Sequence, residues 1–282
     1  MTETIPKLLS MPMPNIMEDK MTVALINGRP ISFTDTLDGD VAIVLSHGLF
    51  MDQSMFDAQV CILREHYRII TWDQRGHGQD TYVTEPFSLW DSADDLSALL
   101  VHLNIDKAVL LGMSQGGYVS LRAALRYPEK VQALVLIATH AGVEEENQKV
   151  VYSQLLSAWL ENSLTDEIVQ GVSTFILGAD KELAKPWIKK WQTIDDNTLC
   201  LNFTALADRD DLAPALSKLQ MPALVIWGNE DGAISAEQAR QLEAGIIHSQ
   251  FMEVVGAAHS VSMTHADIVN TKIKTFLTEA LL

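Results

Sequence analysis

Cysteine and positive charge are both scarce in this 282-residue chain. Cys61, predicted to be buried on a helix, and Cys200 belong to no Cys-x-x-Cys pair, so nothing requires an oxidising compartment or a cysteine zinc site, although a disulfide between them stays open. Acidic residues outnumber basic ones by 37 to 20, for a formal net charge of −17. Because nucleic acids are bound through basic patches that neutralise phosphates, we expect no nucleic-acid partner.

Long hydrophobic runs are missing as well. No apolar stretch reaches the ~18 residues that a membrane span requires. Residues 1–20 lack the basic start and apolar stretch of a secretory signal and are predicted to be an N-terminal arm. We therefore expect a soluble cytoplasmic protein with no membrane partner. The sequence also has no HExxH, P-loop or GxGxxG motif, which argues against the metal and nucleotide sites that these motifs build.

Six short apolar runs predict the strands of a sheet. They are bounded by glycine or polar residues and do not alternate with polar positions, which is typical of strands buried on both faces. The runs cover residues 41–45, 67–72, 107–111, 131–138, 223–227 and 250–255. Ahead of them, residues 21–34 carry Asn27-Gly28 between two apolar stretches. This pair predicts a β-hairpin, because a tight primed turn needs positive φ.

Helical segments lie between most of these runs. Two of them begin with residues in capping-box spacing, Ser88 with Asp91 and Ser235 with Gln238. The two segments are residues 88–103 and 235–245. Strands that alternate with helices form a parallel, doubly wound sheet, and ligands bind beyond the carboxyl ends of its strands. We therefore predict an α/β fold with such a sheet.

The alternation stops between residues 141 and 220, where no clear strand is present. Several helices are predicted there instead, over residues 144–161, 165–177, 181–192, 196–207 and 211–219. A structureless loop of this length is improbable in a compact domain. We therefore predict an inserted helical lobe, residues 141–220, between the two parts of one core, residues 21–140 and 221–282.

A serine follows a predicted strand in LLGMSQGG, residues 110–117. The strand is expected to turn sharply into a helix that starts near Gln115, and Gly112 and Gly116 remove the Cβ atoms that would collide across this turn. Ser114 would then stand above the sheet in a strained conformation that costs on the order of 1–3 kcal/mol. We predict that Ser114 is a nucleophile.

The loops after two later strands supply the groups that a serine nucleophile needs. A serine hydroxyl is barely nucleophilic at neutral pH, so it requires a base, normally a histidine oriented by a carboxylate. His259 follows the last apolar run, and Asp231 follows the run before it. The order Ser114, Asp231, His259 is that of an α/β-hydrolase triad. Glu230, on the same short loop, is the rival to Asp231.

An oxyanion pocket is predicted in the segment LSHGLFMD, residues 45–52, where small residues let a backbone N–H point into the crevice. The Leu49 and Gln115 N–H groups are expected to hold the oxyanion of an acyl-transfer intermediate, and one such donor lowers the barrier by about 2.7–4 kcal/mol. His47 is interpreted as a brace of this loop.

A second polar segment, Asp73-Gln74-Arg75-Gly76-His77-Gly78, follows the second apolar run. Asp73 and Arg75 are interpreted as a pair that stabilises the loop, and His77 as part of its turn. Together with His47-Gly48, the serine segment and the loops that carry Asp231 and His259, this segment resembles the α/β-hydrolase fold family in order and spacing.

The resemblance covers residues 21–140 and 221–282, and the lobe corresponds to the variable cap of that family. The chain is most similar to the small serine esterases and lactonases, including hydrolases like the 3-oxoadipate enol-lactonases. This resemblance implies an eight-stranded, mostly parallel sheet, no metal or organic cofactor, and hydrolysis through an acyl-enzyme. Serine at position 114 argues against the dehalogenases and epoxide hydrolases of this fold, which carry aspartate there.

Five side chains are candidates for substrate binding. Phe50 and Met113 adjoin the expected oxyanion donors, and methionine adapts to irregular apolar shapes, which suits a largely apolar substrate. His140 follows a strand and is a candidate contact, with a hydrogen-bonded structural role as the alternative. Trp159 and Trp187 lie in the lobe, where packing in the lobe core is the alternative.

The sequence therefore predicts a serine hydrolase that cleaves a small, largely apolar carboxylic ester or lactone and is a monomer or homodimer. A carbon–carbon bond hydrolase and a cofactor-free perhydrolase of the same fold are alternatives within enzymes. A small-molecule receptor in which hydrolysis is vestigial is the alternative from another class.

Overall fold

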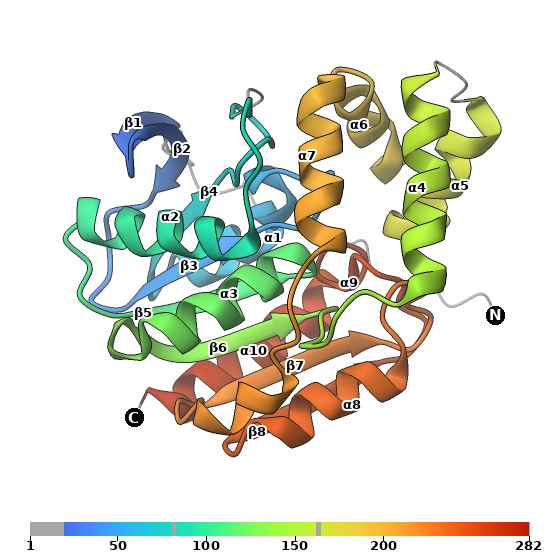
Figure 1. The fold of residues 1–282 in the computed structure, drawn as a ribbon. Helices are drawn as coiled ribbons and strands as arrows, with labels where there is room; N and C mark the ends of the chain where they lie inside the picture. Colours follow the sequence, from blue (N-terminus) through green and yellow to red (C-terminus); the bar gives the residue numbers. More distant parts are fainter. Residues whose placement is uncertain (1–19, 81–82, 162–164, 282) are drawn as a thin grey trace, which may run out of the picture.

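A computed structural model of the protein describes residues 20–80, 83–161 and 165–281, so the predicted arm lies outside the described residues except for its last residue. Eight strands form one sheet in the order β1-β2-β4-β3-β5-β6-β7-β8 (Figure 1). The strands are β1 (Thr22–Ile26), β2 (Arg29–Asp35), β3 (Ala42–Ser46), β4 (Arg68–Trp72), β5 (Ala108–Met113), β6 (Val131–Ile137), β7 (Ala223–Gly228) and β8 (Ser249–Val254). Only the β1–β2 and β2–β4 pairs are antiparallel, which confirms the predicted eight-stranded, mostly parallel sheet.

The predicted hairpin joins β1 and β2 through Asn27 and Gly28. Both residues have positive φ, 51° at Asn27 and 77° at Gly28, as a primed turn requires. The turn pairs Ile26 with Arg29 across the hairpin and so sets the register of both strands.

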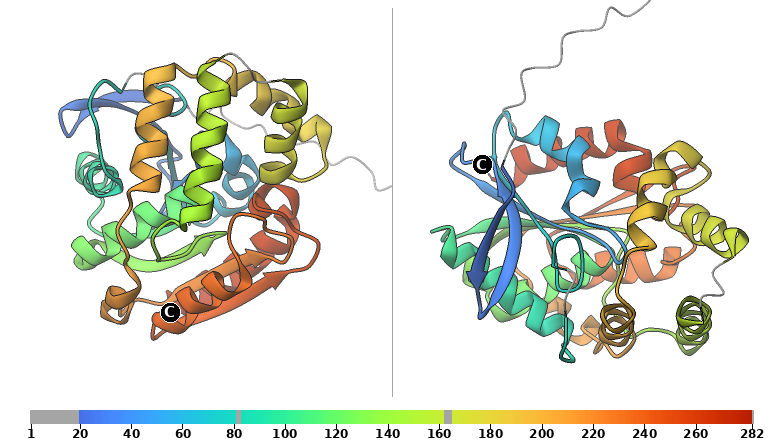
Figure 2. Two further views of the ribbon diagram at one scale, coloured as in Figure 1. Left: turned by 45° about the vertical axis from the view of Figure 1, so that its right-hand side comes forward. Right: turned by 90° about the horizontal axis from the view of Figure 1, so that it is seen from above.

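Helices cover both faces of the sheet (Figures 1 and 2). One face carries α2 (Leu89–His102), α3 (Gln115–Arg126) and α8 (Ala236–Gly245); the other carries α1 (Asp57–Leu63), α9 (Val261–Thr264) and α10 (Ala266–Ala280). Short 3-10 helices form η1 (Gln53–Phe56), η2 (Pro128–Lys130) and η3 (Ala213–Lys218). The capping boxes predicted at Ser88 and Ser235 begin α2 and α8.

Two hydrophobic cores lie on opposite faces of the sheet because successive strand residues point in opposite directions. In β5, Leu110 packs in the core that includes α2 and α3, whereas Val109 and Leu111 pack in the core that includes α1 and α10. Strand β8 was expected to be buried on both faces, but most of its residues are half-exposed. It lies at the edge of the sheet and has one neighbouring strand. Cys61 is also exposed rather than buried, and both cysteines are free.

Four helices lie between β6 and β7 and form a helical insertion, residues 146–207, which stands beside the carboxyl ends of the parallel strands (Figure 2). They are α4 (Glu146–Leu160), α5 (Asp166–Leu177), α6 (Lys181–Trp191) and α7 (Asp196–Ala207). The segment predicted as a helix over residues 211–219 is the 3-10 helix η3. No helix in the described ranges is long and apolar enough to cross a membrane.

Candidate active site

Ser114 stands between β5 and α3 in a backbone conformation that is unfavourable for a residue with a side chain. Its φ is 50° and its ψ is −115°, and such a conformation costs on the order of 1–3 kcal/mol that the surrounding packing must offset. The Ser114 N–H donates to the Ile137 carbonyl at 2.9 Å, and Thr139 Oγ1 donates to the Ser114 carbonyl at 3.0 Å. These bonds hold the backbone of Ser114 against the end of β6.

Two glycines make the turn at Ser114 possible, as the sequence predicted. A Cβ on Gly112 would lie 2.2 Å from the Gly116 carbonyl oxygen, and a Cβ on Gly116 would lie 1.8 Å from the Ser46 carbonyl oxygen. Both neighbours are backbone atoms that cannot rotate away. Helix α3 therefore starts directly against β3 and β5, and the Ser114 side chain is left at the rim of the sheet.

The Asp231 and His259 side chains meet above the ends of β7 and β8. His259 Nδ1 donates to the Asp231 carboxylate, at 3.0 Å from Oδ1 and 2.9 Å from Oδ2. Oδ1 also accepts from the Ala233 and Ile234 N–H groups, and the Asp231 side chain has 0% exposure. With the proton on Nδ1, the His259 Nε2 atom is left as an acceptor. Glu230, the rival on the same loop, is exposed, whereas the Asp231 side chain is buried.

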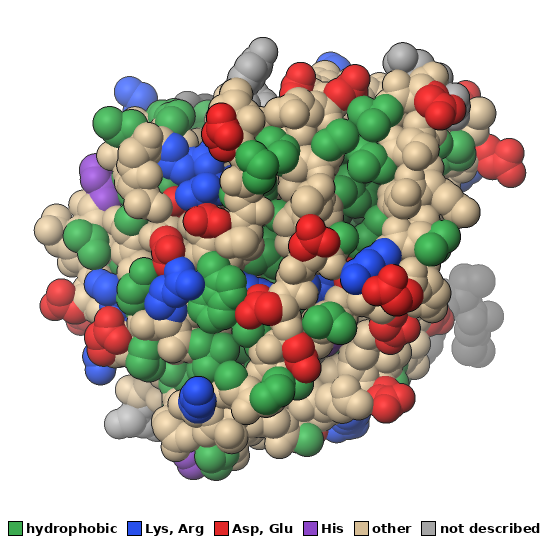
Figure 3. Space-filling view, viewed as in Figure 1, with side chains coloured by type: hydrophobic (Ala, Val, Ile, Leu, Met, Phe, Trp, Pro, Cys, Tyr) green, Lys and Arg blue, Asp and Glu red, His purple; other side chains and the backbone are tan. Residues whose placement is uncertain are grey.

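Ser114 and His259 both line a cavity of about 390 Å³ between the strand ends and the helical insertion. Within the described residues, no hydrogen bond joins the Ser114 hydroxyl to the His259 ring. Bonds of this kind are often long before substrate binds and tighten in the reacting complex. Figure 3 shows hydrophobic side chains gathered between α4 and α7, and residues of both helices belong to the cavity wall.

Two backbone N–H groups lie next to Ser114. Leu49 follows β3 and lines the cavity, and Gln115 is the first residue of α3. In the described part of the chain neither N–H donates to an acceptor. The N-terminus of a helix also carries partial positive charge, which favours an anion at that position.

The loop that carries Leu49 is held from below by a buried histidine. His47 Nδ1 donates to the Gly48 carbonyl at 2.9 Å, while its Nε2 accepts from the Gln74 N–H at 3.0 Å. Burial lowers the pKa of His47 to about 4, so the ring is neutral and able to donate at one nitrogen and accept at the other. The interpretation of His47 as a brace of this loop is therefore confirmed.

The same loop is held from above by α6. Trp191 Nε1 donates to the Phe50 carbonyl at 2.7 Å, and Phe50 has a φ of 64°. Lys190, the preceding residue, pairs with Asp52 at 2.6 Å. The helical insertion is thus hydrogen-bonded directly to the segment that aims the Leu49 N–H.

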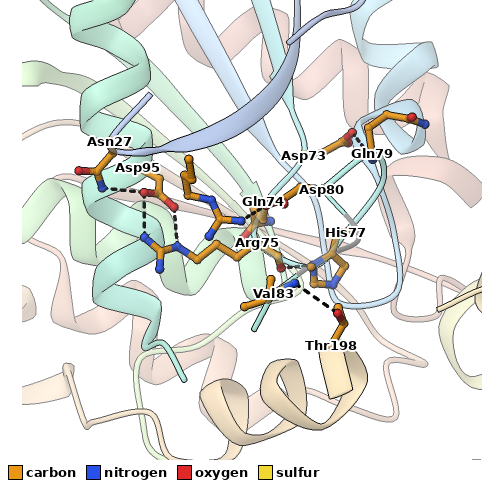
Figure 4. Close-up of polar contacts among 12 residues, drawn as sticks. Asn27, Asp73, Gln74, Arg75, His77, Gln79, Asp80, Val83, Asp95 and Thr198 are labelled. Carbon is orange, nitrogen blue, oxygen red and sulfur yellow. Dashed lines mark hydrogen bonds and ion pairs between the residues drawn. The ribbon is translucent and has the colours of Figure 1, made fainter. Parts of the chain in front are cut away.

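Asp73 and Arg75 do not form the predicted pair with each other (Figure 4). Asp73 accepts from the Gln53 and Gln79 N–H groups, whereas Arg75 forms two hydrogen bonds to Asp95 on α2. Asp95 also accepts from Asn27 in the hairpin turn. The segment is stabilised as expected, but by partners that are distant in sequence.

The structure separates the five predicted substrate contacts. Phe50 and Met113 line the cavity. Trp159 does not line the cavity, but its ring stacks on the Phe50 ring with the two centroids 5.5 Å apart. Trp187 is buried in the hydrophobic core on the α1 and α10 side and does not line the cavity. His140 is also outside the lining; it is buried and accepts from Arg209 at 2.8 Å, which favours the structural alternative.

Several cavity-lining residues were not predicted. Four of them are polar: Tyr118, Glu144, Gln148 and Tyr152. Glu144 and Gln148 belong to an acidic, polar stretch that resembles an ordinary solvated surface in the sequence, so no local pattern marks them. In the described ranges, no group of three or more His, Cys, Asp or Glu side chains is arranged to hold a metal ion.

Comparisons with known proteins agree with this architecture. A family model of the alpha/beta hydrolase fold matches residues 41–266. The dihydrolipoyllysine-residue acetyltransferase component of the acetoin cleaving system of Pseudomonas putida is 31% identical over 246 residues, which cover 85% of this chain and 64% of that relative. The 3-oxoadipate enol-lactonase 2 of Acinetobacter baylyi is 26% identical over 239 residues, which cover 83% of this chain and 87% of that relative.

A solved structure has the same fold. The enol-lactonase from Burkholderia xenovorans LB400 superposes with a TM-score of 0.82 at 26% identity, covering 91% of this chain and 100% of that chain.

Proposed function

Because the chain belongs to the alpha/beta hydrolase fold family, we propose that it is a serine hydrolase that cleaves a carboxylic ester or lactone through an acyl-enzyme. One observation carries the proposal: Ser114, on its strained turn, faces the same cavity as His259, whose Nδ1 is held by the buried Asp231 carboxylate. The enol-lactonase names of one relative and one similar structure support this class of substrate.

In the proposed mechanism, His259 Nε2 takes the proton of Ser114 Oγ as that oxygen attacks the substrate carbonyl carbon. The carbonyl π electrons move to the oxygen, which the Leu49 and Gln115 N–H groups stabilise. Asp231 orients the ring and stabilises its protonated form. Collapse of the intermediate breaks the bond to the alcohol oxygen, which receives the proton from His259.

The second half repeats these steps with water. His259 removes a proton from the water as it attacks the acyl-enzyme, and the second tetrahedral intermediate releases the acid and restores the Ser114 hydroxyl. We propose that the helical insertion is the cap that encloses the substrate, since α4, α5 and α7 supply much of the cavity wall. The mostly apolar lining suits a largely apolar substrate. The cytoplasmic location and the monomeric or homodimeric state stay predictions.

A fluorophosphonate probe tests the proposal directly. We expect one probe molecule to attach covalently per chain, and peptide mass spectrometry to find it on Ser114, because such reagents react with serines activated by a neighbouring base. Boiled protein, in which the site is lost, is the control. Absence of labelling, or labelling of another serine, would contradict the proposed nucleophile.

Trp191 provides a test of the proposed oxyanion hole. We expect Trp191→Phe to lower kcat about tenfold while KM for a short p-nitrophenyl ester stays similar, because an oxyanion contact is made in the transition state and not in the bound substrate. Without the bond from Trp191 Nε1, Phe50 is free to leave its left-handed conformation and to move the neighbouring Leu49 N–H.

Trp187→Phe is the matched control, since it makes the same change at another buried tryptophan of α6. It removes packing in the insertion but keeps the Trp191 Nε1 bond to the Phe50 carbonyl, so thermal unfolding should shift while kcat does not. An equal loss of kcat in both variants would mean that Trp191 acts only through the stability of the insertion.

A further inference from the structure

Polar side chains are concentrated in one part of the cavity. Apart from Ser114 and His259, the polar side chains in its lining are those of Tyr118, Glu144, Gln148 and Tyr152. Tyr118 lies on α3, Gln148 and Tyr152 lie on α4, and Glu144 lies just before α4. We refer to these four side chains as the polar corner. The rest of the wall is almost entirely aliphatic, aromatic or methionine side chains.

Glu144 is the charged member of the polar corner. Its exposed fraction is only 7%, and its Oε2 atom accepts from Arg209 Nη1 at 2.6 Å. Its other carboxylate oxygen forms no hydrogen bond within the described residues, yet Glu144 lines the cavity. A carboxylate oxygen in so enclosed a place is costly to leave without a donor, so a ligand group that donates there gains a strong, charge-assisted bond.

Arg209 neutralises Glu144 from behind the cavity wall. Its side chain is 1% exposed, and it is not part of the cavity lining. It also donates to the Gly142 carbonyl, the Leu206 carbonyl and His140. The guanidinium also packs over the Tyr118 ring, 4.4 Å from its centroid. A ligand in the cavity therefore meets the carboxylate of this ion pair and not the cation.

The two tyrosines present hydroxyl groups rather than further charges. Burial raises the pKa of Tyr118 to about 12, and burial also raises the pKa of Tyr152. Both phenols are protonated near neutral pH and can donate or accept one hydrogen bond. They therefore complement a ligand hydroxyl or ammonium group without competing for the charge of Glu144.

We propose that the polar corner binds a hydroxyl or ammonium group of the substrate, remote from the reacting carbonyl, and discriminates against substrates that carry a carboxylate there. That the bound molecule is a substrate rests on the proposed hydrolase function, whereas the binding preference does not. A carboxylate would face Glu144, and no Lys or Arg side chain is among the described lining residues to offset the repulsion. The acceptable substrate is thus an apolar ester or lactone with one donor group.

Calorimetric binding of three ligands with the same alkyl chain tests this preference without requiring turnover. The ligands are hexylammonium, hexan-1-ol and hexanoate, titrated into the full-length protein at high salt so that the net negative charge of the surface is screened. We expect hexylammonium and hexan-1-ol to bind about tenfold or more tightly than hexanoate. Equal affinities, or tighter binding of hexanoate, would overturn the proposal.

The Glu144→Gln variant tests whether the polar corner causes this binding preference. It should reduce the ratio of hexylammonium to hexanoate affinity by about tenfold or more, while hexan-1-ol changes little. Glu146→Gln removes the same charge two residues away on a side chain that is 87% exposed, and it should leave the ratio unchanged. If both variants alter the ratio equally, the preference comes from general surface charge and the proposal is wrong.

A second variant covers the case in which an unpaired Arg209 prevents Glu144→Gln from folding. The double change Glu144→Leu with Arg209→Met removes both members of the buried ion pair, a replacement that proteins often tolerate. It should abolish the preference for hexylammonium in the same way. A folded double variant that keeps the wild-type ratio would contradict the proposal. Hydrolysis of p-nitrophenyl hexanoate, measured in parallel, reports on the serine chemistry alone, so the two proposals can fail separately.

Discussion

Ser114→Ala is expected to lower kcat/KM for a short p-nitrophenyl ester by about 10⁴-fold or more, with the residual rate coming from the oxyanion donors and substrate binding. The alanine cannot form the acyl-enzyme, and no other serine, threonine or cysteine is among the described residues that line the cavity. The Ser114 side chain forms no capping hydrogen bond to α3, so the melting temperature should change little. Steady-state kinetics and thermal unfolding measure both effects.

Ser92→Ala is the control for this substitution. Ser92 is a buried serine on α2 whose hydroxyl has no hydrogen-bond partner in the described part of the chain, and it lies outside the cavity. Its removal should leave ester hydrolysis unchanged. Full activity in the Ser114→Ala protein would refute the proposed nucleophile, whatever the other residues do.

Asp231→Asn is expected to lower kcat by about 10³–10⁴-fold, because it moves the proton of the neutral His259 ring from Nδ1 to Nε2. In the wild type, Oδ1 of Asp231 accepts from the Ala233 and Ile234 N–H groups at 2.8 and 3.1 Å. An asparagine oxygen would keep these two bonds and turn its NH₂ group toward His259 Nδ1. The imidazole would then carry its proton on Nε2 and could not accept the proton of Ser114.

Glu230→Gln is the matched control, because it makes the same acid-to-amide change on the adjacent residue. The Glu230 side chain is exposed, so this variant should keep wild-type kinetics. A loss of kcat for Glu230→Gln with retained activity for Asp231→Asn would exchange the proposed roles of the two carboxylates. The fluorophosphonate labelling rate should fall in parallel with kcat for Asp231→Asn.

Local rules were sufficient for most of the scaffold. Asn27-Gly28 predicts its hairpin because few other residue pairs adopt positive φ so readily, and the Ser88 and Ser235 capping boxes begin their helices for equally local reasons. The exposure of β8 was missed because an apolar run does not reveal which strand will be last in the sheet. Strand order depends on the whole chain.

The loops at the strand ends were predictable in kind but not in their detailed partners. Parallel strands bring their carboxyl ends to one edge, so Asp231 and His259 were expected to meet, and their side chains are hydrogen-bonded. Arg75 was instead paired with the wrong acid. Its partner, Asp95, lies on α2, and nothing near Arg75 in the sequence marks that helix as its neighbour.

The sequence by itself determined the individual strands and helices and the turn at Ser114, because hydrophobic runs, capping residues and glycine spacing act over a few residues. Only the tertiary structure decided what surrounds a ligand. Arg209 lies 65 residues after Glu144, yet the two meet behind the cavity wall, and Trp191 donates to the carbonyl of Phe50, which lies 141 residues earlier in the chain. Such contacts arise when separately folded segments pack together, and no short-range pattern in the chain encodes them.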